Sequence, residues 1–121
     1  YNLRNQEAAV TESGTIQTFI QSLLPRQYVL HQNYPNPFNP ITTLRFEMPQ
    51  ESEAALVIYN LLGQEVARLH DSLHEGPLAA GYHEVMWNGR DDQGQNLSSG
   101  LYFARFVTPA YTKTIKLLLL K

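Results

Sequence analysis

The stretch Asn33-Tyr34-Pro35-Asn36-Pro37-Phe38-Asn39-Pro40 holds three prolines within eight residues and marks where the fold begins. Each proline fixes φ, removes a backbone donor and drives the residue before it toward extended conformations. The stretch is therefore neither an interior helix nor a central strand. Tyr34 and Phe38 are its two large apolar side chains, and we expect both rings to dock against a neighbouring core. The alternative is a plain proline-rich linker, but strand-like sequence follows at once. We therefore expect a rigid lead into a domain that begins around Leu30.

The residues after this proline segment (residues 33–40) have strand periodicity. Apolar residues at 44, 46 and 48 alternate with polar residues at 43, 45 and 47 until Pro49 ends the run, which predicts a half-buried strand. Residues 54–59 are apolar on both faces, as in a central strand. The turn 60–63, in which Gly63 can take a positive φ, then leads into a strand over 64–69. These two strands are expected to form a hairpin.

Three further strands are expected in the second half of the chain. A loop over 70–80 precedes a strand over 81–87, in which Trp87 is the best candidate for the centre of the core. A tight polar loop over 88–95 precedes a strand over 101–107, and Pro109-Ala110 turns the chain into the last strand, 113–120. Six or seven short strands with no helical pattern between them predict an all-β fold. We expect an antiparallel immunoglobulin-like β-sandwich of about seven strands.

Length and composition fit one module with an N-terminal extension. The chain has 121 residues, is 43% hydrophobic and 17% charged, and carries a net charge of -2, which offers no basic surface for nucleic acid. Cysteine is absent, and no apolar run approaches the about 20 residues that span a bilayer. We assign residues 28–121 to the domain and 1–27 to a linker or the tail of a preceding domain. In this extension the apolar residues at 16, 19, 20, 23 and 24 fit one face of a short helix, and residues 15–20 fit a strand equally well. Because the chain begins at Tyr1 without a signal-peptide pattern, we expect it to be a piece of a larger polypeptide.

The loop over 88–95 contains the best candidate for a metal site. Asn88, Asp91 and Asp92, followed by Asn96, cluster the oxygen ligands that calcium prefers. The same side chains can instead cap the turn through backbone amides. The spacing lacks the EF-hand pattern, so we favour the turn and expect no bound metal.

Other catalytic chemistry has little support in the sequence. The four histidines, at positions 31, 70, 74 and 83, are expected at the surface rather than at a metal. No serine lies in a nucleophile elbow and no glycine-rich loop suits a phosphate. We therefore expect a protein that is not an enzyme and needs no cofactor.

The aromatic residues allow a sugar-stacking platform as a second interpretation. Most of them occupy alternating strand positions, which favours the core over an exposed surface. The residues considered are Tyr34, Phe38, Tyr59, Tyr82, Trp87 and Tyr102.

Four further blocks follow the proline segment in order. They are Tyr59-Asn60-Leu61-Leu62-Gly63-Gln64-Glu65-Val66, then Ala80-Gly81-Tyr82-His83 with Trp87-Asn88-Gly89-Arg90-Asp91, then Ser99-Gly100-Leu101-Tyr102, and a lysine-flanked apolar end. Over about residues 28–121, the five blocks together resemble the type A C-terminal sorting domain of cargo proteins of the type IX secretion system. The middle blocks are also similar to the immunoglobulin-like domain of the flagellar hook-capping protein, which lacks the Asn-Pro-Phe-Asn-Pro sequence. Asn88 stands where the sorting domains usually have Asp, and residues 73–78 lengthen one loop.

The resemblance implies a non-catalytic export signal at the C-terminus of a larger secreted protein of a Gram-negative bacterium. Its implied partners are the outer-membrane translocon, the shuttle protein and the sortase of that system, with a cargo domain attached covalently in front. Cleavage would fall within residues 12–27, and the product would pass through the periplasm to the cell surface or the exterior. In that family the last strand is needed most for export, here Lys113, Ile115, Lys116, Leu117, Leu118, Leu119, Leu120 and Lys121.

The pattern of the last strand is compatible with that role. Leucine and isoleucine side chains occupy both faces of residues 115–120, and an apolar terminal strand is a candidate for edge pairing with a partner. The lysines at 113, 116 and 121 would oppose self-association. A last strand buried by its own domain is the competing interpretation, and a carbohydrate-binding or adhesion module and an assembly scaffold are the competing functions.

Overall fold

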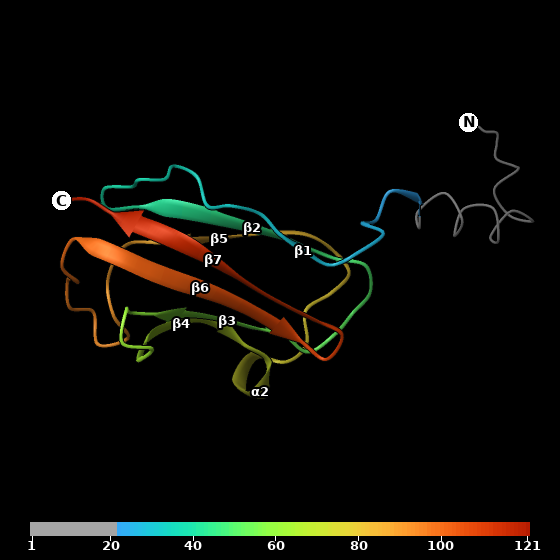
Figure 1. Ribbon diagram of the computed structural model, residues 1–121. Helices are drawn as coiled ribbons and strands as arrows, with labels where there is room; N and C mark the ends of the chain where they lie inside the picture. The colour runs from blue at the N-terminus through green and yellow to red at the C-terminus, as the bar shows by residue number, and fades with distance from the viewer. Residues whose placement is uncertain (1–21) are drawn as a thin grey trace, which may run out of the picture.

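The computed structural model describes residues 22–121, and these form seven strands and one short helix. Figure 1 shows two stacked sheets, with the first described residues and the C-terminus at opposite ends of the domain. No helix within this part of the chain is long and apolar enough to cross a bilayer. The elements are β1 (Val29–Leu30), β2 (Thr42–Met48), β3 (Ala55–Tyr59), β4 (Glu65–Asp71), α2 (Ser72–Glu75), β5 (Gly81–Trp87), β6 (Gly100–Thr108) and β7 (Tyr111–Leu119).

The strands pair antiparallel throughout and divide into two sheets. The three-stranded sheet has the order β1-β2-β5, and the four-stranded sheet has the order β4-β3-β6-β7. The prediction of an antiparallel immunoglobulin-like sandwich of about seven strands is confirmed. The last strand therefore lies at an edge of the four-stranded sheet, where one side of its backbone has no neighbouring strand of that sheet.

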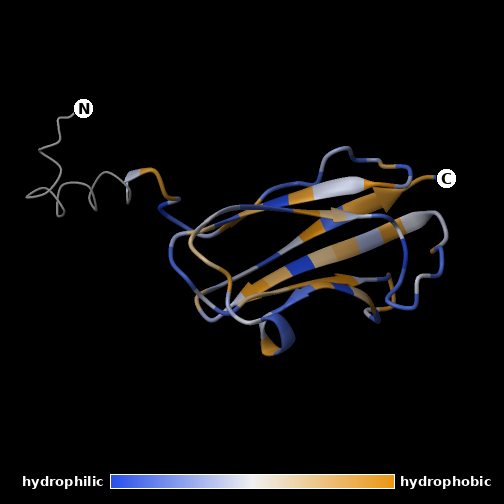
Figure 2. Ribbon diagram, turned by 180° about the vertical axis from the view of Figure 1, so that it is seen from behind, coloured by the Kyte–Doolittle hydropathy of each residue, from blue (hydrophilic) through white to orange (hydrophobic). Residues whose placement is uncertain are grey.

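The predicted periodicities match the burial of the strands. In β2, Leu44, Phe46 and Met48 are buried, whereas the residues between them are more exposed. In β3, Val57 is buried although it lies on the outer face, because β3 is an inner strand with β4 and β6 on either side. Figure 2 shows the same division, with hydrophobic residues concentrated on the strands and hydrophilic residues in many of the connections.

The core is built around Trp87, as the sequence predicts. The Trp87 ring centroid lies 5.6 Å from that of Phe38 and 5.6 Å from that of Tyr102. The indole N–H donates to the carbonyl oxygen of Arg90 at 2.9 Å, so the buried ring has its polar group satisfied. A second aromatic pair, Phe46 and Phe106, joins the two sheets at 4.7 Å between centroids.

The segment 70–80 differs from the loop that the sequence predicts. β4 continues through Asp71, and a single helical turn, α2, follows it. Asp71 is the N-cap, and its side chain accepts a hydrogen bond from the backbone N–H of Leu73 at 2.9 Å. Gly76 closes the turn with a φ of 84°. The choice between a helix and a strand for residues 15–20 lies outside the described part of the chain.

Candidate functional site

The outer edge of β7 is the first part of the candidate site. Alternate residues of an antiparallel strand direct their backbone groups to the same neighbour. The backbone groups of Lys116 and Leu118 point away from β6. The Lys116 carbonyl accepts a hydrogen bond from Gln32 Nε2 at 2.7 Å, and the Leu118 N–H donates to Asn36 Oδ1 at 2.9 Å. Thr112 and Thr114 occupy the same alternation, so their backbone groups face outward as well.

The proline segment covers the C-terminal half of this edge. The Phe38 N–H donates to the Leu118 carbonyl at 2.9 Å, and the Leu120 N–H donates to the Phe38 carbonyl at 3.0 Å. The Phe38 side chain is only 2% exposed, as predicted. The expectation for Tyr34 is wrong, because its ring is 71% exposed. Tyr34 uses its backbone instead, exchanging two hydrogen bonds of 3.0 Å with Thr43, and this pairing leaves its ring at the surface.

Asn33 holds the proline segment against β2. Its side chain is buried, and Nδ2 donates to Thr42 Oγ1 at 2.9 Å and to the Pro35 carbonyl at 3.2 Å. The Thr42 hydroxyl donates to the same carbonyl at 2.8 Å. A buried amide needs such hydrogen-bond partners. The Pro35 carbonyl accepts from both the Asn33 amide and the Thr42 hydroxyl. The two asparagines Asn33 and Asn36 thus tie the segment to β2 and β7 respectively.

Other blocks of the resemblance also meet at the end of β7. An added Cβ at Gly89 would lie 3.4 Å from Leu119 Cδ2 and 3.4 Å from the Pro40 carbonyl oxygen, so this glycine packs directly against both segments. The Lys121 N–H donates to Ser99 Oγ at 2.9 Å. Segments that are far apart in the sequence are therefore assembled around the C-terminus of the chain.

The residues predicted for translocon recognition divide into two groups. Ile115, Leu117 and Leu119 are buried in the core of the domain itself. Leu118 is half-buried and Leu120 is exposed. The accessible members of the predicted set are Leu118, Leu120, Lys113, Lys116 and Lys121.

In the loop 88–95, side-chain oxygens accept hydrogen bonds from backbone N–H groups. Asp91 Oδ1 accepts from the backbone N–H groups of Gln93 and Gln95, each at 2.9 Å. Asp92 Oδ1 accepts from the Arg68 backbone N–H at 3.1 Å, and Asn88 Oδ1 accepts from the Arg90 N–H at 3.2 Å. The contacts of Asn88 and Asp91 match the turn-capping alternative, whereas Asp92 joins the loop to β4. Within residues 22–121, no group of three or more His, Cys, Asp or Glu side chains is placed to hold a metal.

The histidines occupy different environments. His31 and Glu47 form an exposed contact of 2.6 Å, and His83 lies 2.8 Å from the Ala79 carbonyl oxygen. The expectation of a surface position is wrong for His70, which is buried at the end of β4. Its Nδ1 lies 3.0 Å from Glu75 Oε1 and its Nε2 lies 3.2 Å from Ser72 Oγ. His70 pairs in register with the buried Leu56, so its side chain lies on the core-facing side of β4, and it also fastens α2 to the sheet.

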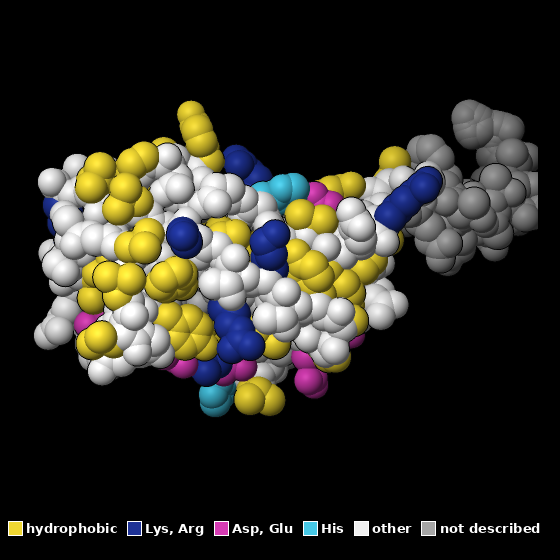
Figure 3. Space-filling view, viewed as in Figure 1, with side chains coloured by type: hydrophobic (Ala, Val, Ile, Leu, Met, Phe, Trp, Pro, Cys, Tyr) yellow, Lys and Arg dark blue, Asp and Glu magenta, His cyan; other side chains and the backbone are white. Residues whose placement is uncertain are grey.

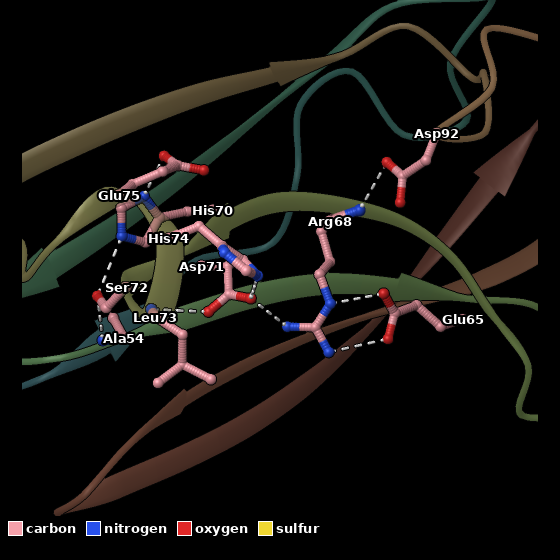
Figure 4. A network of polar contacts seen from close by, with 10 residues as sticks. All are labelled: Ala54, Glu65, Arg68, His70, Asp71, Ser72, Leu73, His74, Glu75 and Asp92. Atoms are coloured by element: carbon pink, nitrogen blue, oxygen red, sulfur yellow. Dashed lines mark hydrogen bonds and ion pairs between the residues drawn. The ribbon is translucent and has the colours of Figure 1, made fainter.

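Arg68 organises a polar network beside α2 (Figure 4). Its guanidinium binds both carboxylate oxygens of Glu65, at 2.6 and 3.0 Å, and Asp71 Oδ2 at 3.0 Å. The hydrogen bonds with Glu65, reinforced by the charges of Glu65 and Asp71, raise the pKa of Arg68 above its usual value. Both acids are thus engaged by one cation on the outer side of the four-stranded sheet.

The six aromatic residues considered for a sugar platform do not form one. Phe38, Trp87 and Tyr102 are in the core. Tyr34 and Tyr82 are exposed beside the three-stranded sheet, whereas Tyr59 belongs to the four-stranded sheet. Sequence reasoning missed a different group, in which Tyr59 and Phe103 pair across β3 and β6 beside Arg105 and Thr114. The available signal was an arginine at an alternate position within the otherwise apolar strand β6.

Comparison with known proteins identifies the domain type. The family profile of the FlgD Ig-like domain matches residues 39–107, which is more than half of the chain. No curated protein matches the chain in sequence.

Two solved structures of larger proteins contain a domain of similar fold. PorZ, a surface component of the type IX secretion system of Porphyromonas gingivalis, has a TM-score of 0.52 and 20% identity over 76% of this chain and 11% of PorZ. Dimeric latent PorU from the same organism has a TM-score of 0.56 and 20% identity over 77% of this chain and 9% of PorU. FlgD from P. aeruginosa has 22% identity over 79% of this chain and 73% of that chain, with a TM-score of 0.49. The profile match and the immunoglobulin-like sandwich agree, and this chain belongs to the FlgD Ig-like domain family.

Proposed function

We propose that this chain is a non-catalytic C-terminal secretion signal that directs a larger cargo protein across the outer membrane by the type IX secretion system. The observation that carries the proposal is the joint assembly of the proline segment and β7. The FlgD family match covers residues 39–107 and leaves out most of the proline segment and all of β7. In the sequence resemblance, the proline segment distinguishes the sorting domains and the last strand is needed most for export. Hydrogen bonds between residues 36–38 and 118–120 join the two parts.

The placement of the two chain ends supports the proposal. The first described residues lie at one end of the sandwich and the C-terminus lies at the other (Figure 1). A cargo domain that precedes this chain would thus be attached away from Leu120 and Lys121. The exposed side chains of Leu120 and Lys121 stay accessible to a receptor while the cargo is folded.

The partners in this proposal are the outer-membrane translocon, the shuttle protein and the sortase of that system. The sortase cuts ahead of the domain, within residues 12–27, and the cargo is then attached to the surface or released. The solved structure of PorZ places a domain of similar fold in a surface component of the same system. The chain corresponds to about a tenth of the length of PorZ and of PorU.

Export of a reporter tests the proposal. A fluorescent protein with a Sec signal peptide is fused to residues 1–121 and produced in a bacterium with a working type IX system, beside the same fusion without residues 113–121. Reporter in the medium or on the surface is compared with reporter in the periplasm. We expect export only of the full fusion. Periplasmic retention of a folded full fusion would refute the sorting role in that host.

A pair of matched variants separates recognition from folding, because removal of 113–121 also removes Ile115, Leu117 and Leu119 from the core. Leu120 is 48% exposed at the end of β7, and Leu62 is 82% exposed in the β3–β4 turn. Leu120→Asp and Leu62→Asp each remove one exposed leucine and add one negative charge. We expect export to fall several-fold for Leu120→Asp and to stay unchanged for Leu62→Asp. An equal effect of both variants would contradict recognition of the C-terminal end.

A further inference from the structure

The outer faces of the two sheets differ in how their charges are arranged. On the three-stranded sheet, Arg45 is paired with Glu84 at 2.9 Å and His31 contacts Glu47 at 2.6 Å. On the four-stranded sheet, Arg68 already binds the two nearby acids, Glu65 and Asp71. Arg105, in the middle of β6, makes no ion pair or hydrogen bond through its side chain with any of residues 22–121.

The unpaired arginine has apolar side chains as well as other cations around it. Arg105 pairs in register with Val57 of β3 and Thr114 of β7, and the Tyr59–Phe103 pair lies two residues along. Figure 3 looks onto the side that carries β6 and β7, and it shows hydrophobic side chains around a few Lys and Arg side chains, with Asp and Glu at the margins. Arg105 is exposed and has no anionic partner on this face among the described residues, while Lys116 pairs with Phe103 across β6 and β7.

A hollow of about 260 Å³ lies at this position and is open to solvent. The residues that line it include Tyr59, Phe103, Arg105 and Thr114. Its size is slightly below the about 300 Å³ at which pockets begin to enclose drug-sized ligands. The hollow therefore suits one ring-sized unit of a longer ligand, with the remainder in solvent.

Three polar groups of the hollow are free to bind a ligand. The guanidinium of Arg105 and the hydroxyls of Tyr59 and Thr114 form no hydrogen bond within the described part of the chain. The side chain of Asn60, which also lines the hollow, is occupied, because Oδ1 accepts from the N–H groups of Leu62 and Gln64. The available chemistry is one planar cation, two hydroxyls and two aromatic rings.

We propose that this hollow binds a sugar residue that carries a carboxylate, as in a uronic acid unit of an acidic polysaccharide. The apolar C–H face of a sugar ring packs on aromatic side chains. The guanidinium of Arg105 matches a carboxylate with two parallel hydrogen bonds, and the hydroxyls of Tyr59 and Thr114 bind ring hydroxyls. This site does not depend on the export function, since its side chains lie on the sheet face rather than at the end of β7.

Binding of defined oligosaccharides to the full 121-residue chain tests the proposal. Tetragalacturonate is the acidic probe and cellotetraose is the uncharged one, and binding is followed by calorimetry and by NMR shifts. We expect tetragalacturonate to bind and to shift resonances of Tyr59, Phe103 and Arg105. Cellotetraose should bind at least about tenfold more weakly, since it lacks the charge-assisted hydrogen bonds.

Two arginine variants form a matched pair. Arg105→Gln removes the cation of the hollow, whereas Arg45→Gln removes an exposed cation of the opposite sheet. We expect Arg105→Gln to weaken tetragalacturonate binding at least about tenfold, and Phe103→Leu to weaken it by removing the ring. Arg45→Gln should leave binding unchanged, and unfolding curves confirm that each variant is folded.

Several results would overturn the proposal. Absence of binding, equal binding of both probes, or equal losses in Arg105→Gln and Arg45→Gln would each do so. If no sugar binds but a reporter fusion with Arg105→Gln loses export, the face contacts a protein of the export machinery instead. Failure of export for the unaltered fusion leaves the binding result standing, so the two proposals can fail separately.

Discussion

At the scale of single residues, the proline segment shows how position decides the contribution of an aromatic ring. Phe38 and Tyr34 are four residues apart on the same stiff backbone, and sequence reasoning treated them alike. Phe38 faces the core because Asn36 and the backbone of Phe38 bond to β7. Tyr34 pairs with β2 through its backbone, which turns its ring to solvent. Irregular segments have no fixed period, so the sequence alone does not tell which ring turns inward.

The two rings give a direct prediction for stability. Phe38→Ala should lower the free energy of unfolding by about 3–5 kcal/mol, because it removes a buried ring packed on Trp87. Tyr34→Ala should change it by no more than about 0.5 kcal/mol, since the ring is exposed and its backbone bonds remain. Urea unfolding followed by tryptophan fluorescence measures both. Equal losses for the two variants would mean that Tyr34 also packs against the domain.

The candidate sugar site was also beyond single-residue reasoning. Alternation predicts that Tyr102 and Phe103 point to opposite faces, and Tyr102 is indeed in the core. Whether the outer face of β6 meets solvent, a helix or another sheet depends on the tertiary structure. The sequence therefore places an arginine on the outer face of β6, and only the tertiary structure shows that Arg105 has no acidic partner there among residues 22–121.

At the scale of elements, the strands were predictable and the short helix was not. Period-2 alternation predicts β2, and an apolar run followed by the turn at Gly63 predicts the hairpin of β3 and β4, each within one or two residues of the observed bounds. The sequence Asp71 to Gly76 did carry helix signals, an N-cap residue and a closing glycine. The sequence Gly76-Pro77 nevertheless favours a continuous loop, because four residues are too few to show helical periodicity.

The edge of β7 gives a prediction for single amides. The N–H groups of Thr112, Thr114 and Lys116 face outward with no acceptor within residues 22–121, so they should exchange with deuterium quickly. The outward N–H of Leu118 should exchange slowly, because Asn36 Oδ1 accepts it. Hydrogen exchange measured by NMR at several protein concentrations distinguishes these amides.

Asn36→Ala is the matched control for this exchange pattern. It should speed exchange at Leu118 and leave Leu120 protected, because the Phe38 carbonyl still accepts the Leu120 N–H. Slow exchange at Thr114 in dilute protein would show that another part of the chain covers this half of the edge. The open half would then be unavailable for pairing with a partner strand.

At the scale of the whole molecule, the sequence predicted the sandwich but not the division of its strands between sheets. Local alternation places residues inside or outside, whereas the orders β1-β2-β5 and β4-β3-β6-β7 come from long-range pairing. The contact between the proline segment and β7, about 80 residues apart, is of the same kind. Such contacts make the first and last parts of the domain depend on each other.

Truncation at the N-terminal side tests that dependence and the predicted domain boundary. A chain of residues 28–121 keeps β1, the proline segment and the stacked rings of Tyr28 and Tyr111, whose centroids are 5.9 Å apart. It should unfold at nearly the same temperature as the 121-residue chain.

A chain of residues 41–121 loses Leu30 and Phe38 from the core and uncovers the bonded half of β7. Loss of Phe38 alone is expected to cost about 3–5 kcal/mol, which is comparable to the total stability of many small domains, so the shorter chain should be largely unfolded at 25 °C. Calorimetry and circular dichroism of the three chains provide the measurement. A cooperative transition of unchanged midpoint for residues 41–121 would show that the proline segment is only a linker, whereas a large loss for residues 28–121 would move the boundary toward the N-terminus.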